Sequence, residues 1–192
     1  MFESFFPKPK LFLMTLVGWL AIVIGIYYSI GKKIGELIGF SFSEEGAETV
    51  IGLGYFITPE FLWFDLYYIF STILFFVFWS YYSPHKWQIW SILGSSFLIL
   101  MAYLTVQVSV VINAWYGPFY NDIQKALGGG GEVTAGDLYG HFLVFCIIVF
   151  PYIIFVPFKL FFTSHYVFRW RNAMNDFYTE KWSDVKHIEG AS

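Results

Sequence analysis

The sequence predicts an all-α, polytopic membrane protein, and three observations carry this prediction. Hydrophobic residues make up 57% of the 192 residues and charged residues 13%, against about 25% charged residues in a soluble domain. Four apolar stretches are each long enough to cross a bilayer core of about 30 Å as a helix. Aromatic residues reach 24%, which is typical of membrane proteins with aromatic belts at both interfaces.

The first two predicted spans cover residues 11–30 and 61–82. The first is longer than the apolar region of a signal peptide, about 7–15 residues, and no small-residue cleavage site follows it. We therefore expect an uncleaved helix. The stretch between the two spans, residues 31–60, is too broken by Gly and Glu to cross a membrane, and we expect a short interfacial helix there, on the outer surface.

The third predicted span, residues 87–112, carries no ionised side chain and has chemically different ends. As a helix it would be about 39 Å long at about 1.5 Å per residue. It follows a short basic turn at residues 83–88. Beyond it lies an aromatic segment with an acid, residues 113–122, which we expect Pro118 to break.

The fourth predicted span covers residues 138–162, and Pro151 and Pro157 within it predict a kink. After it, apolar residues recur with a 3.6-residue period, which predicts a cytoplasmic amphipathic helix over residues 164–185 that continues the span. The apolar stripe of this helix needs a partner: the membrane surface, another helix of the chain, or a second subunit. Arg169 and Arg171 are expected to anchor the helix at the cytoplasmic side.

The distribution of basic residues predicts the orientation of the spans. With the N-terminus inside, eight basic residues lie on the inner side and three on the outer side, in agreement with the positive-inside rule. The inner set is Lys8, Lys10, Lys86, Lys159, Arg169, Arg171, Lys181 and Lys186, and the outer set is Lys32, Lys33 and Lys125. Both ends of the chain are therefore predicted to be cytoplasmic.

Polar residues inside the predicted spans are the first functional candidates. Asp65 lies about one turn from the outer end of the second span, and two explanations remain open: an interfacial acid with access to water, or a proton-binding acid near an outer vestibule. Thr105 and Gln107 lie on nearly opposite faces of the third span, which indicates either hydrogen bonds to other helices or a cavity wall. The sequence has no metal-ligand spacing, catalytic arrangement or cofactor motif, and its small net charge of −3 argues against nucleic acid as a partner.

Five motifs extend over the chain: MFESFFPKP at residues 1–9, SPHKWQIWSILG at 83–94, VINAWYGPFY at 111–120, SHYVFRWRNAMN at 164–175 and HIEGA at 187–191. Together they resemble the SbmA/BacA peptide antibiotic transporters of bacterial inner membranes. Residues 31–60 and 126–137 match that family poorly.

The resemblance implies a homodimeric importer whose helices are arranged like the membrane half of an ABC exporter, without a nucleotide-binding domain. Such proteins use the proton gradient to bring in peptides, including antimicrobial peptides, microcins and bleomycin-like compounds. Because family members are longer, we expect residues 1–192 to form the N-terminal portion of the transporter domain. The expected partners are peptide substrates, the lipid bilayer and a second copy of the chain.

A proton-coupled importer needs an acid that titrates in a cavity open alternately to each side. The candidates for this role are Glu189, Asp122 and Asp65. The candidates for lining the substrate cavity are Asn113, Trp115, Tyr116 and Tyr120, whose rings could stack on the proline rings of a peptide.

Two other functions remain open from the sequence. The membrane domain of an ATP-driven ABC transporter would have very similar helices, and a P-loop further along the gene product would distinguish it. A membrane anchoring or assembly subunit would instead recruit a partner through the amphipathic helix, and it would carry no substrate flux.

Overall fold

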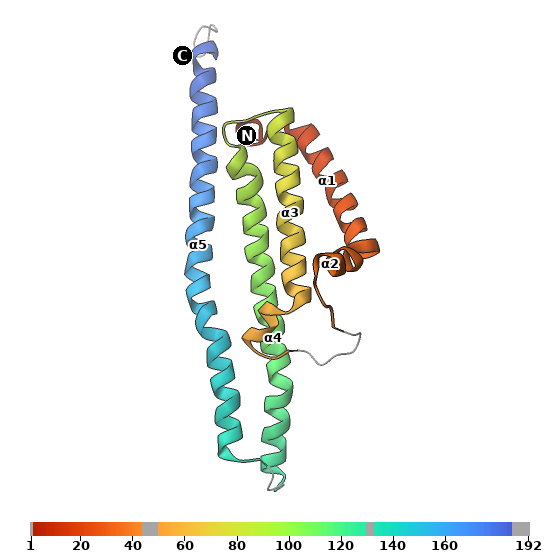
Figure 1. The fold of residues 1–192 in the computed structure, drawn as a ribbon. Helices are drawn as coiled ribbons and strands as arrows, with labels where there is room; N and C mark the ends of the chain where they lie inside the picture. Colours follow the sequence, from red (N-terminus) through yellow and green to blue (C-terminus); the bar gives the residue numbers. More distant parts are fainter. Residues whose placement is uncertain (1, 44–49, 130–132, 186–192) are drawn as a thin grey trace. The chain divides into compact units, whose positions relative to one another are not determined.

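The computed structural model describes residues 2–43, 50–129 and 133–185 (Figure 1). These residues are 87% helical and include no strand, which confirms the predicted all-α class. In chain order the elements are η1 (Phe2–Ser4), α1 (Pro9–Ile26), η2 (Tyr27–Gly31), α2 (Lys32–Ile38), η3 (Leu53–Ile57), α3 (Pro59–Tyr82), η4 (Ile89–Gly94), α4 (Ser95–Leu127) and α5 (Ala135–Val185).

Within the part of the chain that the structure describes, four helical stretches are long and apolar enough to cross a membrane, which agrees with the predicted number of spans. They are Pro9–Ile38, Pro59–Tyr82, Ile89–Leu127 and Ala135–Trp182. Three of them extend well beyond the predicted spans, because a hydropathy pattern reports where a helix is apolar and not where its backbone hydrogen bonds stop. The stretch at residues 31–60 holds two short helices, α2 and η3.

The expected break at Pro118 is wrong, since α4 continues through this residue to Leu127. A proline within a helix removes one backbone hydrogen bond and crowds the preceding turn. The residues on either side offset that cost by packing: Trp115 is 6% exposed and stacks on Phe119 with the ring centroids 4.6 Å apart. Trp115 also packs on Phe145 of α5 with the ring centroids 4.8 Å apart, so tertiary packing overrides the local signal of the proline.

Helix α5 is a single element of 51 residues that contains both Pro151 and Pro157. The amphipathic helix predicted over residues 164–185 is therefore continuous with the predicted fourth span. The helix begins with a reciprocal cap, in which the backbone N–H of Thr134 donates to Asp137 Oδ2 at 2.8 Å and that of Asp137 donates to Thr134 Oγ1 at 3.4 Å. This arrangement satisfies N–H groups that the first turn leaves without helical partners.

The chain forms two compact units. Unit 1 consists of Met1–Lys32, Tyr68–Leu98 and Leu160–Ser192, and unit 2 of Lys33–Tyr67 and Ile99–Lys159. Helices α3, α4 and α5 contribute residues to both units.

In unit 1 the N-terminal segment packs against the later part of α5. The Phe5 side chain is fully buried. Its ring stacks on Trp170 at a centroid distance of 5.2 Å and an interplanar angle of 5°, and it meets Tyr166 edge-on at 5.5 Å. A second cluster joins Phe12 to Trp79 and Ile92. Aromatic packing therefore links α1, α3, η4 and α5 within this unit.

Hydroxyl groups also join the helices of unit 1. Tyr68 on α3 donates to the carbonyl oxygen of Ser96 on α4 at 2.9 Å and accepts from Ser96 Oγ at 2.7 Å. Thr72 Oγ1 lies 2.9 Å from Ser96 Oγ. The neighbouring Ser95 is hydrogen-bonded through Oγ to the hydroxyl of Tyr166 on α5 at 2.6 Å. Since the surroundings are apolar, these bonds favour one particular register of the three helices.

The turn between α3 and η4 is held by a buried amide. Gln88 is 4% exposed; its Nε2 donates to Ser80 Oγ at 2.9 Å, and its Oε1 accepts from the backbone N–H of His85 at 3.3 Å. His85 Nδ1 in turn accepts from the backbone N–H of Trp87 at 3.3 Å, which requires that nitrogen to be unprotonated.

Acidification is therefore expected to destabilise unit 1 through His85. Burial lowers the pKa of His85 below its ordinary value of 6.5, so the unfolded chain takes up this proton more readily than the folded one. Stability should then fall as the pH drops below about 6.5 toward the folded-state pKa, and the loss should stop below that value. The measurement is the free energy of unfolding in detergent from about pH 7.5 to about pH 5, the range in which imidazoles titrate. It should fall less steeply with decreasing pH in His85→Gln than in the unsubstituted protein. An unchanged slope would contradict this assignment.

In unit 2 the two polar faces of α4 contact different elements. Gln107 Oε1 accepts a hydrogen bond from the hydroxyl of Tyr55 on η3 at 2.7 Å. Thr105 Oγ1 accepts one from Lys159 Nζ on α5 at 3.1 Å. Of the two explanations that the sequence left open for these residues, hydrogen bonding between elements is the one that these contacts support.

Candidate functional site

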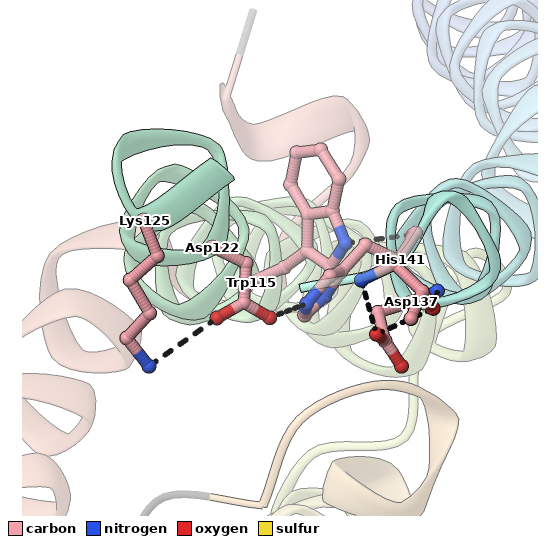
Figure 2. Close-up of polar contacts among 6 residues, drawn as sticks. Trp115, Asp122, Lys125, Asp137 and His141 are labelled. Carbon is pink, nitrogen blue, oxygen red and sulfur yellow. Dashed lines mark hydrogen bonds and ion pairs between the residues drawn. The ribbon is translucent and has the colours of Figure 1, made fainter. Parts of the chain in front are cut away.

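The candidate site lies in unit 2, where the last turns of α4 run beside the first turns of α5 (Figure 1). Trp115 and Asp122 are seven residues apart on α4, so two helical turns place them on the same face. Both contact His141 on α5. Trp115 Nε1 donates to the carbonyl oxygen of His141 at 2.9 Å, and Asp122 Oδ2 lies 2.9 Å from His141 Nε2 (Figure 2).

Each oxygen of the Asp122 carboxylate faces a nitrogen. Oδ2 meets the imidazole of His141, and Oδ1 lies 3.6 Å from Lys125 Nζ, one turn further along α4 (Figure 2). The side chains of Asp122 and His141 are 27% and 21% exposed, whereas that of Lys125 is 61% exposed. The contact with His141 is therefore better shielded from water than the contact with Lys125, and shielding strengthens an electrostatic interaction.

An apolar cluster supports this polar contact. Val111, Trp115 and Ile148 form its buried centre, and the ring of Phe119 lies 6.0 Å from that of His141. The cap formed by Thr134 and Asp137 fixes where α5 begins, and the cluster fixes how its first turns meet α4. Local capping and apolar packing together position His141 against Asp122.

The residues predicted to line a substrate cavity divide into two groups. Trp115 is buried in the cluster just described. Asn113, Tyr116 and Tyr120 are exposed on α4, and the two tyrosine rings stack with centroids 5.6 Å apart and an interplanar angle of 20°. The cavity-lining role of all four residues stays a prediction.

Of the other predicted acids, Asp65 is described by the structure and is not brought to this contact. Asp65 lies on α3, half-buried, and its Oδ1 has no hydrogen-bond partner among the residues that the structure describes. Glu189 lies outside the described residues. Of the two candidates for proton coupling that the structure describes, Asp122 is thus the one that contacts a second titratable side chain on another helix.

The predicted anchor residues of α5 differ in their surroundings. Arg169 is half-buried; its guanidinium carbon lies 5.2 Å from the ring centroid of Trp90, and its Nε donates to His165 Nε2 at 3.2 Å. Arg171 is exposed. An ion pair of 2.7 Å joins Lys86 to Asp176 on α5, and the pKa of Lys86 is raised by its hydrogen bond to that carboxylate.

Sequence reasoning did not identify His141 as part of the site. The signal was nevertheless present, since it is the one histidine within a predicted span and lies near the same predicted end as Asp122. What the sequence lacks is the pairing itself, because the face that α5 turns toward α4 depends on packing. Chemically, the carboxylate and the imidazole form a pair that can bind and release a proton.

A metal centre finds no support in the described part of the chain. Within residues 2–43, 50–129 and 133–185, no three His, Cys, Asp or Glu side chains lie close enough together to hold a metal ion.

The SbmA/BacA-like family matches residues 84–192, which is more than half of the chain. The matched region contains η4, α4 and α5, and with them both partners of the Asp122–His141 contact. With four membrane-length apolar helices among its described residues, the chain is a multi-pass membrane protein that belongs to the SbmA/BacA-like family.

Proposed function

We propose that this chain is part of a transporter that brings peptides inward across the bacterial inner membrane and is driven by the proton gradient. Membership of the SbmA/BacA-like family and the four membrane-length helices support transport. The observation that carries the proton-driven part is the contact between Asp122 and His141, a titratable pair that joins two such helices. A histidine beside a carboxylate can take up and pass on a proton, which is the chemistry that coupling to a proton gradient requires.

The proposed substrates are antimicrobial peptides, microcins and bleomycin-like compounds. The exposed, stacked rings of Tyr116 and Tyr120 lie within two turns of Asp122 on α4. Flat aromatic rings can stack on proline rings, and they bind with little loss of side-chain freedom because they have few rotatable bonds. These tyrosines, with Asn113, are the proposed contacts of the peptide.

The proposed assembly is a homodimer whose helices are arranged like the membrane half of an ABC exporter, with both ends of this chain in the cytoplasm. The later part of α5 supports a partner, since large apolar side chains on it are exposed in the described part of the chain. These are Val167, Phe168, Tyr178 and Trp182. In this proposal α5 continues into the cytoplasm, and a second copy packs against it there.

Uptake of a fluorescent proline-rich peptide into proteoliposomes tests the proposal. We expect uptake when the outside is acidic and little uptake when a protonophore removes the gradient. Asp122→Asn keeps the shape of the side chain but removes the carboxylate that holds a proton at the pair with His141. It should reduce gradient-driven uptake at least about tenfold, the change that corresponds to about 1.4 kcal/mol.

Asp176→Asn is the matched control, because it removes an acid that pairs with Lys86 in unit 1 and should leave uptake unchanged. Uptake that depends on ATP and ignores the gradient would instead indicate the membrane domain of an ABC transporter. A stable hetero-complex without any flux would indicate an anchoring subunit.

A further inference from the structure

We infer that His141 is the proton-binding partner of Asp122, and that its charge sets how tightly the end of α4 is held to the start of α5. The inference rests on the proposed proton-driven function and assigns a role within it to a residue beyond the acids predicted from the sequence. The inference follows from the two hydrogen bonds that His141 makes to α4, because they differ in their dependence on pH.

His141 makes two hydrogen bonds to α4 that differ in their response to pH. The first uses its backbone carbonyl, which accepts from Trp115 Nε1 at 2.9 Å. Neither the indole N–H nor the carbonyl titrates in the working range of a protein, so this bond is independent of pH. The second uses the imidazole Nε2, 2.9 Å from Asp122 Oδ2, and its strength depends on the charge of the ring.

The charged and titratable groups around His141 come from three elements. On α4 they are Asp122 and Lys125. On α5, Asp137 lies about one turn before His141, with its carboxylate bound to Thr134. From η3, Tyr55 packs on the same apolar cluster and directs its hydroxyl to Gln107. Asp122 is the one acid of this set whose carboxylate lies within hydrogen-bond distance of the imidazole.

Protonation of His141 changes its contact with Asp122. A hydrogen bond from a neutral imidazole to a carboxylate becomes an ion pair. A neutral imidazole can donate through one nitrogen, whereas the imidazolium donates through both and carries a positive charge. A hydrogen bond between two ions is stronger than one with a single ionised partner, and partial shielding from water increases the difference. Low pH should therefore tighten the α4–α5 contact and neutral pH should loosen it.

This direction agrees with import driven by an acidic exterior. The positive-inside rule predicts that residues 113–137 lie on the outer side. A proton taken up there would hold the ends of α4 and α5 together, and its loss would let them separate for the next cycle. The proton thus acts as a ligand that favours the state to which it binds more tightly. The size of the shift is set by the difference between its affinities for the two states.

Pulsed EPR distances between two spin labels test the inference directly. Leu127 at the end of α4 and Tyr139 near the start of α5 are 84% and 74% exposed, so Leu127→Cys and Tyr139→Cys provide labelling sites in a Cys146→Ser background. Across the range in which imidazoles titrate, about pH 5 to pH 8, we expect a narrow distance distribution at the acid end and a broad one at the alkaline end.

Two variants separate the two hydrogen bonds. His141→Gln keeps a side chain that can donate to Asp122 but cannot titrate, so the response to pH should be lost. Trp115→Phe removes the indole donor and keeps an aromatic ring, so the distribution should broaden at every pH while the response to pH remains. A response that persists in His141→Gln, or that is absent from the unsubstituted protein, would overturn the inference.

Combining these distances with peptide uptake distinguishes the two proposals. A pH response in a protein that transports no peptide would overturn the proposed function and leave the role of His141 standing. Gradient-driven uptake in a protein without the pH response would overturn the role of His141 and leave the proposed function standing.

Discussion

Replacing Phe5 with alanine is expected to lower the free energy of unfolding of unit 1 by about 3 kcal/mol, the lower end of the range for a buried Phe→Ala change. Phe5 is fully buried, and its ring fills the space between Trp170 and Tyr166. Both partners lie on α5, which can close that space only by moving as a helix. The variant should therefore leave a cavity that the surrounding structure fills incompletely.

Phe2→Ala is the matched control, because Phe2 lies in the same short segment but is 55% exposed. It should cost well under about 1 kcal/mol, as most exposed substitutions do. Reversible unfolding in mixed micelles can be followed by the fluorescence of the eight tryptophans of the chain, Trp170 among them. Equal losses in the two variants would mean that the N-terminal segment does not contribute to the core of unit 1.

Replacing Gly94 with valine should destabilise the same unit by about 2 kcal/mol, within the usual cost of overpacking a filled site. A Cβ atom on Gly94 would lie 3.1 and 3.2 Å from two ring atoms of Tyr166, and 3.4 Å from Trp90. Tyr166 cannot easily move aside, since its hydroxyl is bound to Ser95 and its ring packs on Phe5. Valine adds two methyl groups beyond that already crowded position.

Gly25→Val provides the comparison within the same unit. Apart from its chain neighbours and the backbone of its own helix, no described residue has an atom within 4 Å of the Cβ position of Gly25 on α1. Valine also has a somewhat better helix propensity than glycine. This variant should be neutral or slightly stabilising in the same unfolding assay. If both glycines tolerate valine equally, the close approach of α5 to Gly94 is not required for stability.

The membrane-length helices could be predicted from the sequence because the bilayer imposes a simple rule. A segment that crosses it must be long, apolar and internally hydrogen-bonded, and each of these demands leaves a signal along the chain. Helix ends follow a different rule. The continuation of α4 past Pro118 depends on how Trp115 and Phe119 pack against α5, and the sequence around Pro118 does not contain that information.

The candidate site could be predicted in part. Asp122 and Trp115 were identified from their residue types and from their place beyond an apolar span. His141 was not, because its role depends on which face of α5 meets α4. Asp122 and His141 are 19 residues apart in the chain, and no periodicity in either helix reports a contact of that kind.

The length of α5 has a consequence for its surroundings. At about 1.5 Å per residue its 51 residues measure about 76 Å. A bilayer core of about 30 Å takes up at most about 39 Å of a helix, even at a tilt of about 40°. About half of α5 or more must therefore lie beyond the hydrocarbon, where lipid tails do not cover its apolar side chains.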